Sequence, residues 1–180
     1  MKDTTTVAGY RPITMSDLFD TTDNLIGEGD EEEIADAQAE LRSAEGWFIT
    51  MERNGEKILG SSNTLDHVVR FVSYVPGNSG NICAPDLGSS TFWRVSLEDG
   101  TPVPGEESAD DTDDTDTDTS LKKDDRSEEL PGGGIAPPVQ TIFVASDGEV
   151  KPTVVSGTKV LEGEIPGERF RRWFWAEYPE

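Results

Sequence analysis

The side chains best suited to chemistry in this sequence are one histidine and one cysteine. His67 follows Asp66, but no serine in a nucleophile-elbow motif accompanies them, so a Ser-His-Asp triad is not indicated. A single imidazole also supplies too few ligands for a zinc or iron centre. Cys83 lies in an Asn-Ile-Cys-Ala-Pro segment without a catalytic signature, and a lone cysteine forms no intrachain disulfide. We therefore predict no catalytic residue, no metal ligand and no resident cofactor in this chain.

The acidic segment 105–129 is a second candidate site, because it holds twelve acidic and three basic residues. Asp114, Asp116 and Asp118 have the spacing of carboxylate ligands in a calcium loop. The rest of that motif is missing: a threonine stands at its glycine position, Asp125 replaces the final glutamate, and two lysines lie inside the loop. The segment has almost no apolar side chains to bury, so we interpret it as a disordered linker, with an ordered calcium site as the alternative.

The C-terminal segment 169–178 mixes basic and aromatic side chains, as platforms for single-stranded nucleic acid do. Read as a β-strand, it places aromatic rings on both faces, which is typical of a strand inside a sheet or an interface. We interpret it as a closing strand, with a docking strand for a partner and a nucleic-acid platform as alternatives. The residues predicted to contact a partner are Phe170, Trp173, Phe174, Trp175 and Tyr178.

Charge and length restrict the classes of function. The 180 residues suit one domain, or one domain with an insertion, and 37 acidic against 15 basic residues give a net charge of −22. This excess argues against binding to nucleic acid and to anionic membranes. No apolar run is long enough to cross a membrane, and the first residues lack the core of a signal peptide. We expect no membrane insertion, and either an intracellular protein or a piece of a longer secreted chain.

The hydrophobic periodicity predicts a mainly β fold with one helix. The helix is expected over 31–44, because Asp30 can cap it, Glu33 completes a capping box and glutamates occupy the first turn. Alternation with a period of two then predicts strands over 47–51, 56–60, 68–75 and 91–97. A hairpin is expected from 141–145 and 150–155, with Pro152 placing its strand at a sheet edge. The predicted organisation is 1–104, the linker 105–129, and C-terminal strands and tail in 130–180.

Six short motifs of this chain are familiar together, along with the expected helix and the loop that carries Cys83. They are Leu-Phe-Asp-Thr-Thr-Asp-Asn-Leu-Ile at 18–26, Gly-Trp-Phe-Ile at 46–49, Gly-Glu-Lys-Ile-Leu at 55–59, Phe-Trp-Arg-Val at 92–95, Gly-Ile-Ala-Pro-Pro at 134–138 and Arg-Trp-Phe-Trp at 172–175. These segments resemble the C-terminal part of the PilY family, the tip-associated adhesins of type IV pili, over about residues 11–100 and 131–178.

The resemblance implies part of a β-propeller, related in fold to quinoprotein dehydrogenases, at the pilus tip or outer membrane. The implied function is non-enzymatic: pilus biogenesis and surface adhesion, with minor pilins and the remaining propeller blades as partners. Family members carry a calcium-binding loop, but it matches no positions in this chain, so calcium is possible only for a full-length relative. The alternative function is a blade fragment of a PQQ-dependent dehydrogenase, because 94–100 loosely resembles the strand and turn of such blades.

Overall fold

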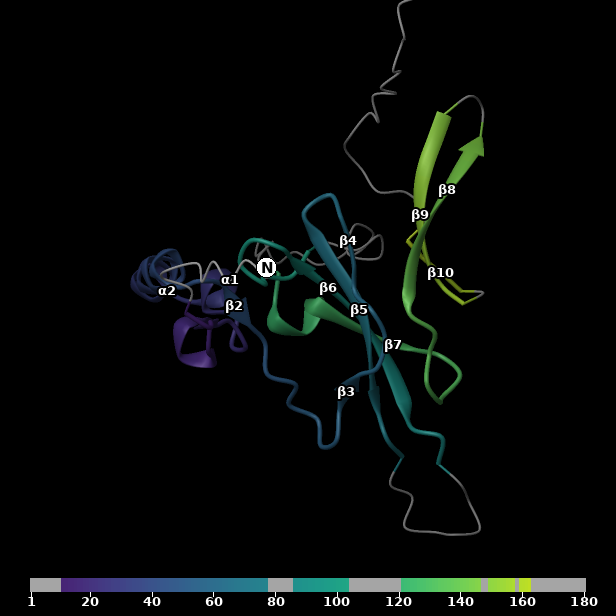
Figure 1. Ribbon diagram of the computed structural model, residues 1–180, viewed down its shortest axis with the longest axis horizontal. Coiled ribbons are helices and arrows are strands. Elements are labelled where there is room, and N and C mark those ends of the chain that lie inside the picture. Colours follow the sequence, from purple (N-terminus) through teal and green to yellow (C-terminus); the bar gives the residue numbers. More distant parts are fainter. Residues whose placement is uncertain (1–10, 78–85, 104–120, 147–148, 158, 163–180) are drawn as a thin grey trace, which may run out of the picture.

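The computed structural model describes residues 11–77, 86–103, 121–146, 149–157 and 159–162. It is mainly β, as predicted, and its two larger sheets are antiparallel. Helices and a short parallel strand pair lie at one side, a larger sheet occupies the centre, and a separate sheet stands at the other side (Figure 1). The described ranges contain two α-helices, where the sequence predicted one.

The central sheet is built on two long antiparallel strands, β5 (Val68–Val75) and β6 (Ser89–Ser96). β6 also pairs with β7 (Ser127–Leu130), whereas β5 pairs with the short strands β3 (Lys57–Ile58) and β4 (Asn63–Leu65). The predicted run 68–75 is therefore confirmed, and the predicted run 91–97 corresponds to β6. The expected run 56–60 is shortened to the two residues of β3.

The outer sheet consists of β8 (Val139–Ser146), β9 (Glu149–Ser156) and β10 (Lys159–Glu162), in the order β10-β9-β8. The predicted hairpin is confirmed, but the prediction that Pro152 marks an edge strand is wrong. β9 lies in the middle of this sheet, and Pro152 pairs with Phe143 of β8. Proline is tolerated because β10 pairs only with residues 154–156 of β9, so within the described part of the chain no strand pairs with Pro152 on the side away from β8.

One hydrophobic core joins the two sheets. It contains Val72 and Phe92 from the central strands, Leu130 from β7, and Val139 and Val154 from the outer sheet. Because this core draws on both sides of segment 105–129, the chain before and after that segment folds against a common interior. The opposite face of β6 presents Trp93, whose ring stacks on Phe71 at a centroid distance of 5.7 Å.

The predicted helix is confirmed as α2 (Glu31–Ser43). The Asp30 carboxylate accepts hydrogen bonds from the backbone N–H groups of Glu32 and Glu33, at 3.0 and 2.9 Å. The Glu33 carboxylate accepts in turn from the Asp30 N–H at 2.9 Å, which completes the capping box. Ala37 is the buried residue of this polar helix, so most of its surface faces solvent.

The N-terminal part also contains a 3-10 helix, η1 (Met15–Asp17), and a short helix, α1 (Leu25–Glu28). The two-residue strands β1 (Phe19–Asp20) and β2 (Trp47–Phe48) pair in parallel, so the expected strand 47–51 is much shorter than predicted. The turn after β6 lies against this pair. Gly100 has φ +68°, and a Cβ there would lie 2.6 Å from the Thr21 side chain, so glycine is required.

The structure differs from the sequence prediction in the second half of the expected linker. Residues 121–130 include a 3-10 helix, η3 (Lys123–Arg126), followed by β7. Lys122 N–H donates to the Asp125 carboxylate at 2.6 Å, which fixes the first turn, and Arg126 is almost fully buried. Tertiary contacts therefore outweigh the polar composition of 121–129. The earlier part of the expected linker, residues 105–120, lies outside the described residues.

Candidate functional site

A network of hydrogen bonds and ion pairs lies between the N-terminal turn at residues 21–24, the loop after β2 and the 3-10 helix η3. A cavity of about 200 Å³ opens there against the face of β6 that carries Trp93. Its walls bring together parts of the chain that are far apart in sequence. The lining residues are Thr22, Ile49, Thr50, Glu52, Arg53, Glu56, Trp93, Lys123, Asp124, Arg126 and Ser127.

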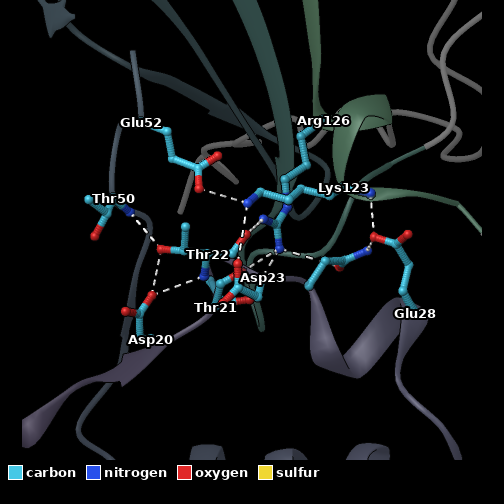
Figure 2. A network of polar contacts seen from close by, with 10 residues as sticks. Asp20, Thr21, Thr22, Asp23, Glu28, Thr50, Glu52, Lys123 and Arg126 are labelled. Carbon is cyan, nitrogen blue, oxygen red and sulfur yellow. Dashed lines mark hydrogen bonds and ion pairs between the residues drawn. The ribbon is translucent and has the colours of Figure 1, made fainter. Parts of the chain in front are cut away.

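Arg126 is the centre of this arrangement, and its side chain points from η3 into the N-terminal turn (Figure 2). The guanidinium donates to the carbonyl oxygens of Thr21 and Thr22 at 2.7 and 2.8 Å. Longer contacts of 3.3 Å reach the Thr21 hydroxyl and the Asn24 Oδ1. Burial lowers the pKa of Arg126, while the negative charges of nearby acids oppose that shift. An arginine remains charged at physiological pH, so its bonds to the two carbonyls are charge-assisted.

The N-terminal turn has the shape that receives this guanidinium because Asn24 adopts a left-handed conformation, with φ +55°. Asparagine tolerates that region better than most residues. Its side-chain amide donates to the Glu28 carboxylate at 3.0 Å and to the Leu121 carbonyl at 3.3 Å. Glu28 also accepts from the Lys123 backbone N–H at 2.6 Å. The turn and η3 are thereby joined by backbone and side-chain bonds as well as by Arg126.

Lys123 closes the outer side of the same network. Its ammonium lies 3.0 Å from a Glu52 carboxylate oxygen and 3.3 Å from one of Asp23 (Figure 2). The hydrogen bond to Glu52 raises the pKa of Lys123 above its ordinary value; burial opposes this shift, and the hydrogen bond to Asp23 adds to it. Lys123 therefore forms ion pairs with two acids from different parts of the chain, Asp23 in the N-terminal turn and Glu52 after β2.

A second polar chain crosses the cavity floor and ends at the indole of Trp93. The guanidinium of Arg53 donates two hydrogen bonds to the Glu56 carboxylate, at 2.7 and 3.0 Å. Ser73 Oγ also donates to Glu56, and Trp93 Nε1 donates to Ser73 Oγ at 2.8 Å. The Glu56 side chain is only 1% exposed, so this chain of bonds provides the partners that a buried carboxylate needs.

The polar groups of this arrangement are mostly paired with one another. Its cations contact carboxylates or carbonyls within the network, and its carboxylates Glu52 and Glu56 are paired with Lys123 and Arg53. These contacts connect the N-terminal turn to η3 and join the loop after β2 to both.

The sequence-predicted residues lie elsewhere. His67 is exposed, with its Nδ1 3.6 Å from a Glu98 carboxylate oxygen, and it shares with Asp66 a positive φ in the turn between β4 and β5. Cys83, the aspartates of the calcium-like spacing, and the aromatic residues at 170–178 lie outside the described residues. Among the residues that are described, no group of three or more histidine, cysteine or acidic side chains is placed to hold a metal ion. The helices in the described ranges are too short or too polar to cross a membrane.

Sequence reasoning missed the residues that form the cavity. Arg126 sits among acidic residues in a segment without apolar periodicity, so nothing nearby indicates that it is buried. The one available signal was the cluster of three bases at 122, 123 and 126, which are the only bases within 105–129.

Comparisons with protein-family models, with curated proteins and with solved structures found no match to this chain.

Proposed function

We propose that this chain is a non-enzymatic assembly and adhesion module of a type IV pilus, which docks to its partners through the outer sheet β8–β10. The observation that carries this proposal is the uneven burial of the β8–β9 hairpin. At one end of the hairpin, Val139 and Val154 are buried in the common core. Further along β8, Ile142, Phe143 and Val144 are 44%, 56% and 44% exposed.

Both faces of the projecting part of the hairpin are apolar. Successive side chains of a strand point to opposite faces, so Phe143 lies on one face and its two neighbours on the other. Val150 of β9 and Val160 of β10 are also more than half exposed. The hairpin extends beyond the rest of the described chain in Figure 1. Exposed apolar side chains on both faces of a projecting hairpin favour an interaction site over a solvent-facing sheet.

The outer edge of β8 offers hydrogen bonds as well as apolar contact. β8 is the terminal strand of its sheet, and among the described residues no strand pairs with its second edge. An open, apolar edge strand either aggregates or is covered by a partner strand. A neighbouring propeller blade or a minor pilin with an exposed edge has the required chemistry.

The central sheet supports a blade-like origin for the module. β5, β6 and β7 are antiparallel neighbours in chain order, as the strands of a propeller blade are. With β3 or β4 at the other side, they would make one four-stranded blade that needs neighbours on its faces. The remaining elements of the proposal, which are a location at the pilus tip or outer membrane and partner contacts by Phe170, Trp173, Phe174, Trp175 and Tyr178, rest on the sequence resemblance.

The test is a binding assay between the full chain and purified minor pilins of type IV pili. The double variant Phe143→Ser/Val144→Ser removes apolar surface from the projecting hairpin, whereas Ile13→Ser/Leu87→Ser removes similar surface elsewhere, since those residues are 59% and 65% exposed. We expect the first variant to lose at least tenfold in affinity and the second to bind as the wild type does. Both should keep the thermal midpoint of the wild type, because exposed side chains contribute little to stability.

A truncation after Gly167 tests the tail separately, because it removes the five aromatic residues and leaves β8–β10 in place. We expect this truncated chain to bind minor pilins more weakly than the full chain does. Equal binding by the wild type and the hairpin variant would contradict the proposed docking surface, and the absence of binding to any minor pilin would contradict the pilus function.

A further inference from the structure

The turn before β3 places an exposed asparagine directly before a glycine. Asn54 and Gly55 form its tip, and the Glu56 N–H closes the turn by donating to the Arg53 carbonyl oxygen at 3.1 Å. Asn54 is exposed, and Gly55 has φ +77°. Within the described ranges, neither the Asn54 side chain nor the Gly55 N–H makes a hydrogen bond. Both groups are therefore accessible to water.

An asparagine in this setting can lose its side-chain amide without an enzyme. The backbone nitrogen of the next residue gives up its proton and attacks the side-chain carbonyl carbon. The new C–N bond closes a five-membered succinimide, and the amide nitrogen leaves as ammonia. Water then opens the ring at either carbonyl, which yields aspartate or isoaspartate, so water is the only reactant and no electron is transferred. A following glycine favours the attack, because it has no Cβ to obstruct it, and asparagine is among the thermolabile residues.

The other asparagines of the chain are less suited to this reaction. Asn54 alone among the five is followed by glycine. Asn24 is buried with its side-chain amide bonded, and the Asn63 side chain accepts from the Thr141 hydroxyl at 2.8 Å. The asparagines at 78 and 81 lie outside the described residues. Of the asparagines that the structure describes, Asn54 is therefore the most reactive.

The turn after β6 provides a structural contrast, because there too an acidic-type side chain precedes glycine. Gly100 is buried, and its N–H donates to the Ser96 carbonyl oxygen at 3.0 Å. The Asp99 carboxylate accepts from the N–H and the hydroxyl of Thr101, at 3.1 and 2.8 Å. Both groups that would have to meet in a succinimide are thus held by other bonds. The fold protects this pair and leaves the pair at 54–55 open.

We infer that Asn54 is a site of spontaneous deamidation, and that its modification perturbs the polar chain that ends at Trp93. The product adds a carboxylate beside Arg53, whose guanidinium makes two hydrogen bonds to Glu56. Isoaspartate also lengthens the main chain of the turn that positions both residues. The Glu56 side chain is only 1% exposed and accepts from Ser73, which accepts in turn from the Trp93 N–H at 2.8 Å. A change at an exposed turn thereby reaches a buried carboxylate and an indole.

The test follows the full chain during incubation at mildly alkaline pH, which favours loss of the amide proton. Mass spectrometry of its peptides detects the exchange of NH₂ for OH, and elution separates aspartate from isoaspartate. Asp99→Asn is the matched comparison, because it makes a second Asn-Gly pair in the turn whose glycine N–H is bonded. In the folded variant, we expect Asn54 to convert at least tenfold faster than position 99. In urea, the two rates should agree within about threefold, because unfolding removes the protecting bonds.

The effect on the polar chain is measured by the Trp93 Nε1–H signal in ¹⁵N–¹H spectra. We expect a shifted signal to grow with the converted fraction of the wild type. Asn54→Gln, incubated in the same way, should keep the original signal, because glutamine would have to close a less favourable six-membered ring. This replacement lies at an exposed position without hydrogen bonds in the described chain, so it should leave folding unchanged.

The inference is overturned if Asn54 converts no faster than position 99 in the folded variant, or if the Trp93 signal does not follow the conversion. If Asp99→Asn fails to fold, the wild type is compared with itself in urea. Folding that slows conversion at Asn54 more than tenfold would then overturn the inference, and a smaller effect would support it.

Discussion

Replacing Arg126 by methionine tests whether the buried guanidinium holds the N-terminal part of the chain to the central sheet. Methionine has a similar unbranched stem but no donors. The substitution leaves the Thr21 and Thr22 carbonyl oxygens without the bonds of 2.7 and 2.8 Å that they accept in the wild type. Both residues are buried, at 2% and 9% exposure, so water cannot readily replace the lost donors.

The expected loss follows from these two acceptors. A buried polar group left without a partner costs about 1–3 kcal/mol, so the two carbonyls together cost about 2–6 kcal/mol. Part of this is offset, because the variant no longer desolvates a guanidinium on folding. We expect a net decrease of about 3 kcal/mol in the free energy of unfolding, which is a large part of the roughly 5–15 kcal/mol of an ordinary domain.

Urea denaturation followed by tryptophan fluorescence measures this change. With a denaturant slope of about 2 kcal/mol per molar, the midpoint should fall by about 1.5 M. Lys123→Met is the matched control, because it removes the same charge from the same 3-10 helix. Its partners Glu52 and Asp23 are 61% and 78% exposed, so the expected loss is only about 0–1 kcal/mol. The reasoning is refuted if Arg126→Met unfolds within about 0.5 kcal/mol of the wild type, or if the control loses as much.

Three further perturbations give defined outcomes. Raising NaCl from low concentration to about 1 M should raise the thermal midpoint, because screening weakens the self-repulsion of a chain with net charge −22; an unchanged midpoint would show that repulsion is not limiting. The Asp17 carboxyl, which accepts from the Thr14 backbone and from the Arg11 and Thr14 side chains, has its pKa lowered to about 2. It therefore favours the folded state above its ordinary pKa and loses that effect as the pH falls through 2, so an NMR titration midpoint near 4 would contradict the geometry. Ser73→Ala should lower the free energy of unfolding by about 1–3 kcal/mol, because it leaves the Trp93 N–H without its acceptor; urea denaturation with Ser89→Ala as control measures it.

The elements that the sequence predicted well are those whose local pattern agrees with their environment. α2 has its capping box and acidic first turn within four residues, so its N-terminus needed no tertiary information. β5, β6 and the β8–β9 hairpin are runs rich in β-branched and aromatic residues, which favour strands. Phe92 and Trp93 follow one another in β6 and so face opposite sides of the sheet, the first in the core and the second in the stack on Phe71.

The rest depended on contacts that leave no local pattern. β1 and β2 are two-residue strands that pair in parallel across more than twenty residues, so neither shows an alternation. Arg126 is buried because carbonyl oxygens of Thr21 and Thr22 point at it, and a carbonyl oxygen has no sequence signature. In an acidic segment, the sequence around Arg126 is equally consistent with an exposed, solvated side chain. The cavity could not be predicted for the same reason, since its walls come from four distant segments.

The hydrogen bonds from Arg126 to the N-terminal turn also constrain the order in which parts of the nascent chain can fold. Thr21 and Thr22 precede their donor by 105 and 104 residues, so they leave the ribosome long before it is made. At about 5–20 residues per second, that interval lasts roughly 5–20 s. During this time α2 can form from local contacts alone, whereas the turn at 21–24 has no guanidinium to close around. The N-terminal part of the nascent chain is therefore completed late, only after residue 126 has been made and has left the ribosome.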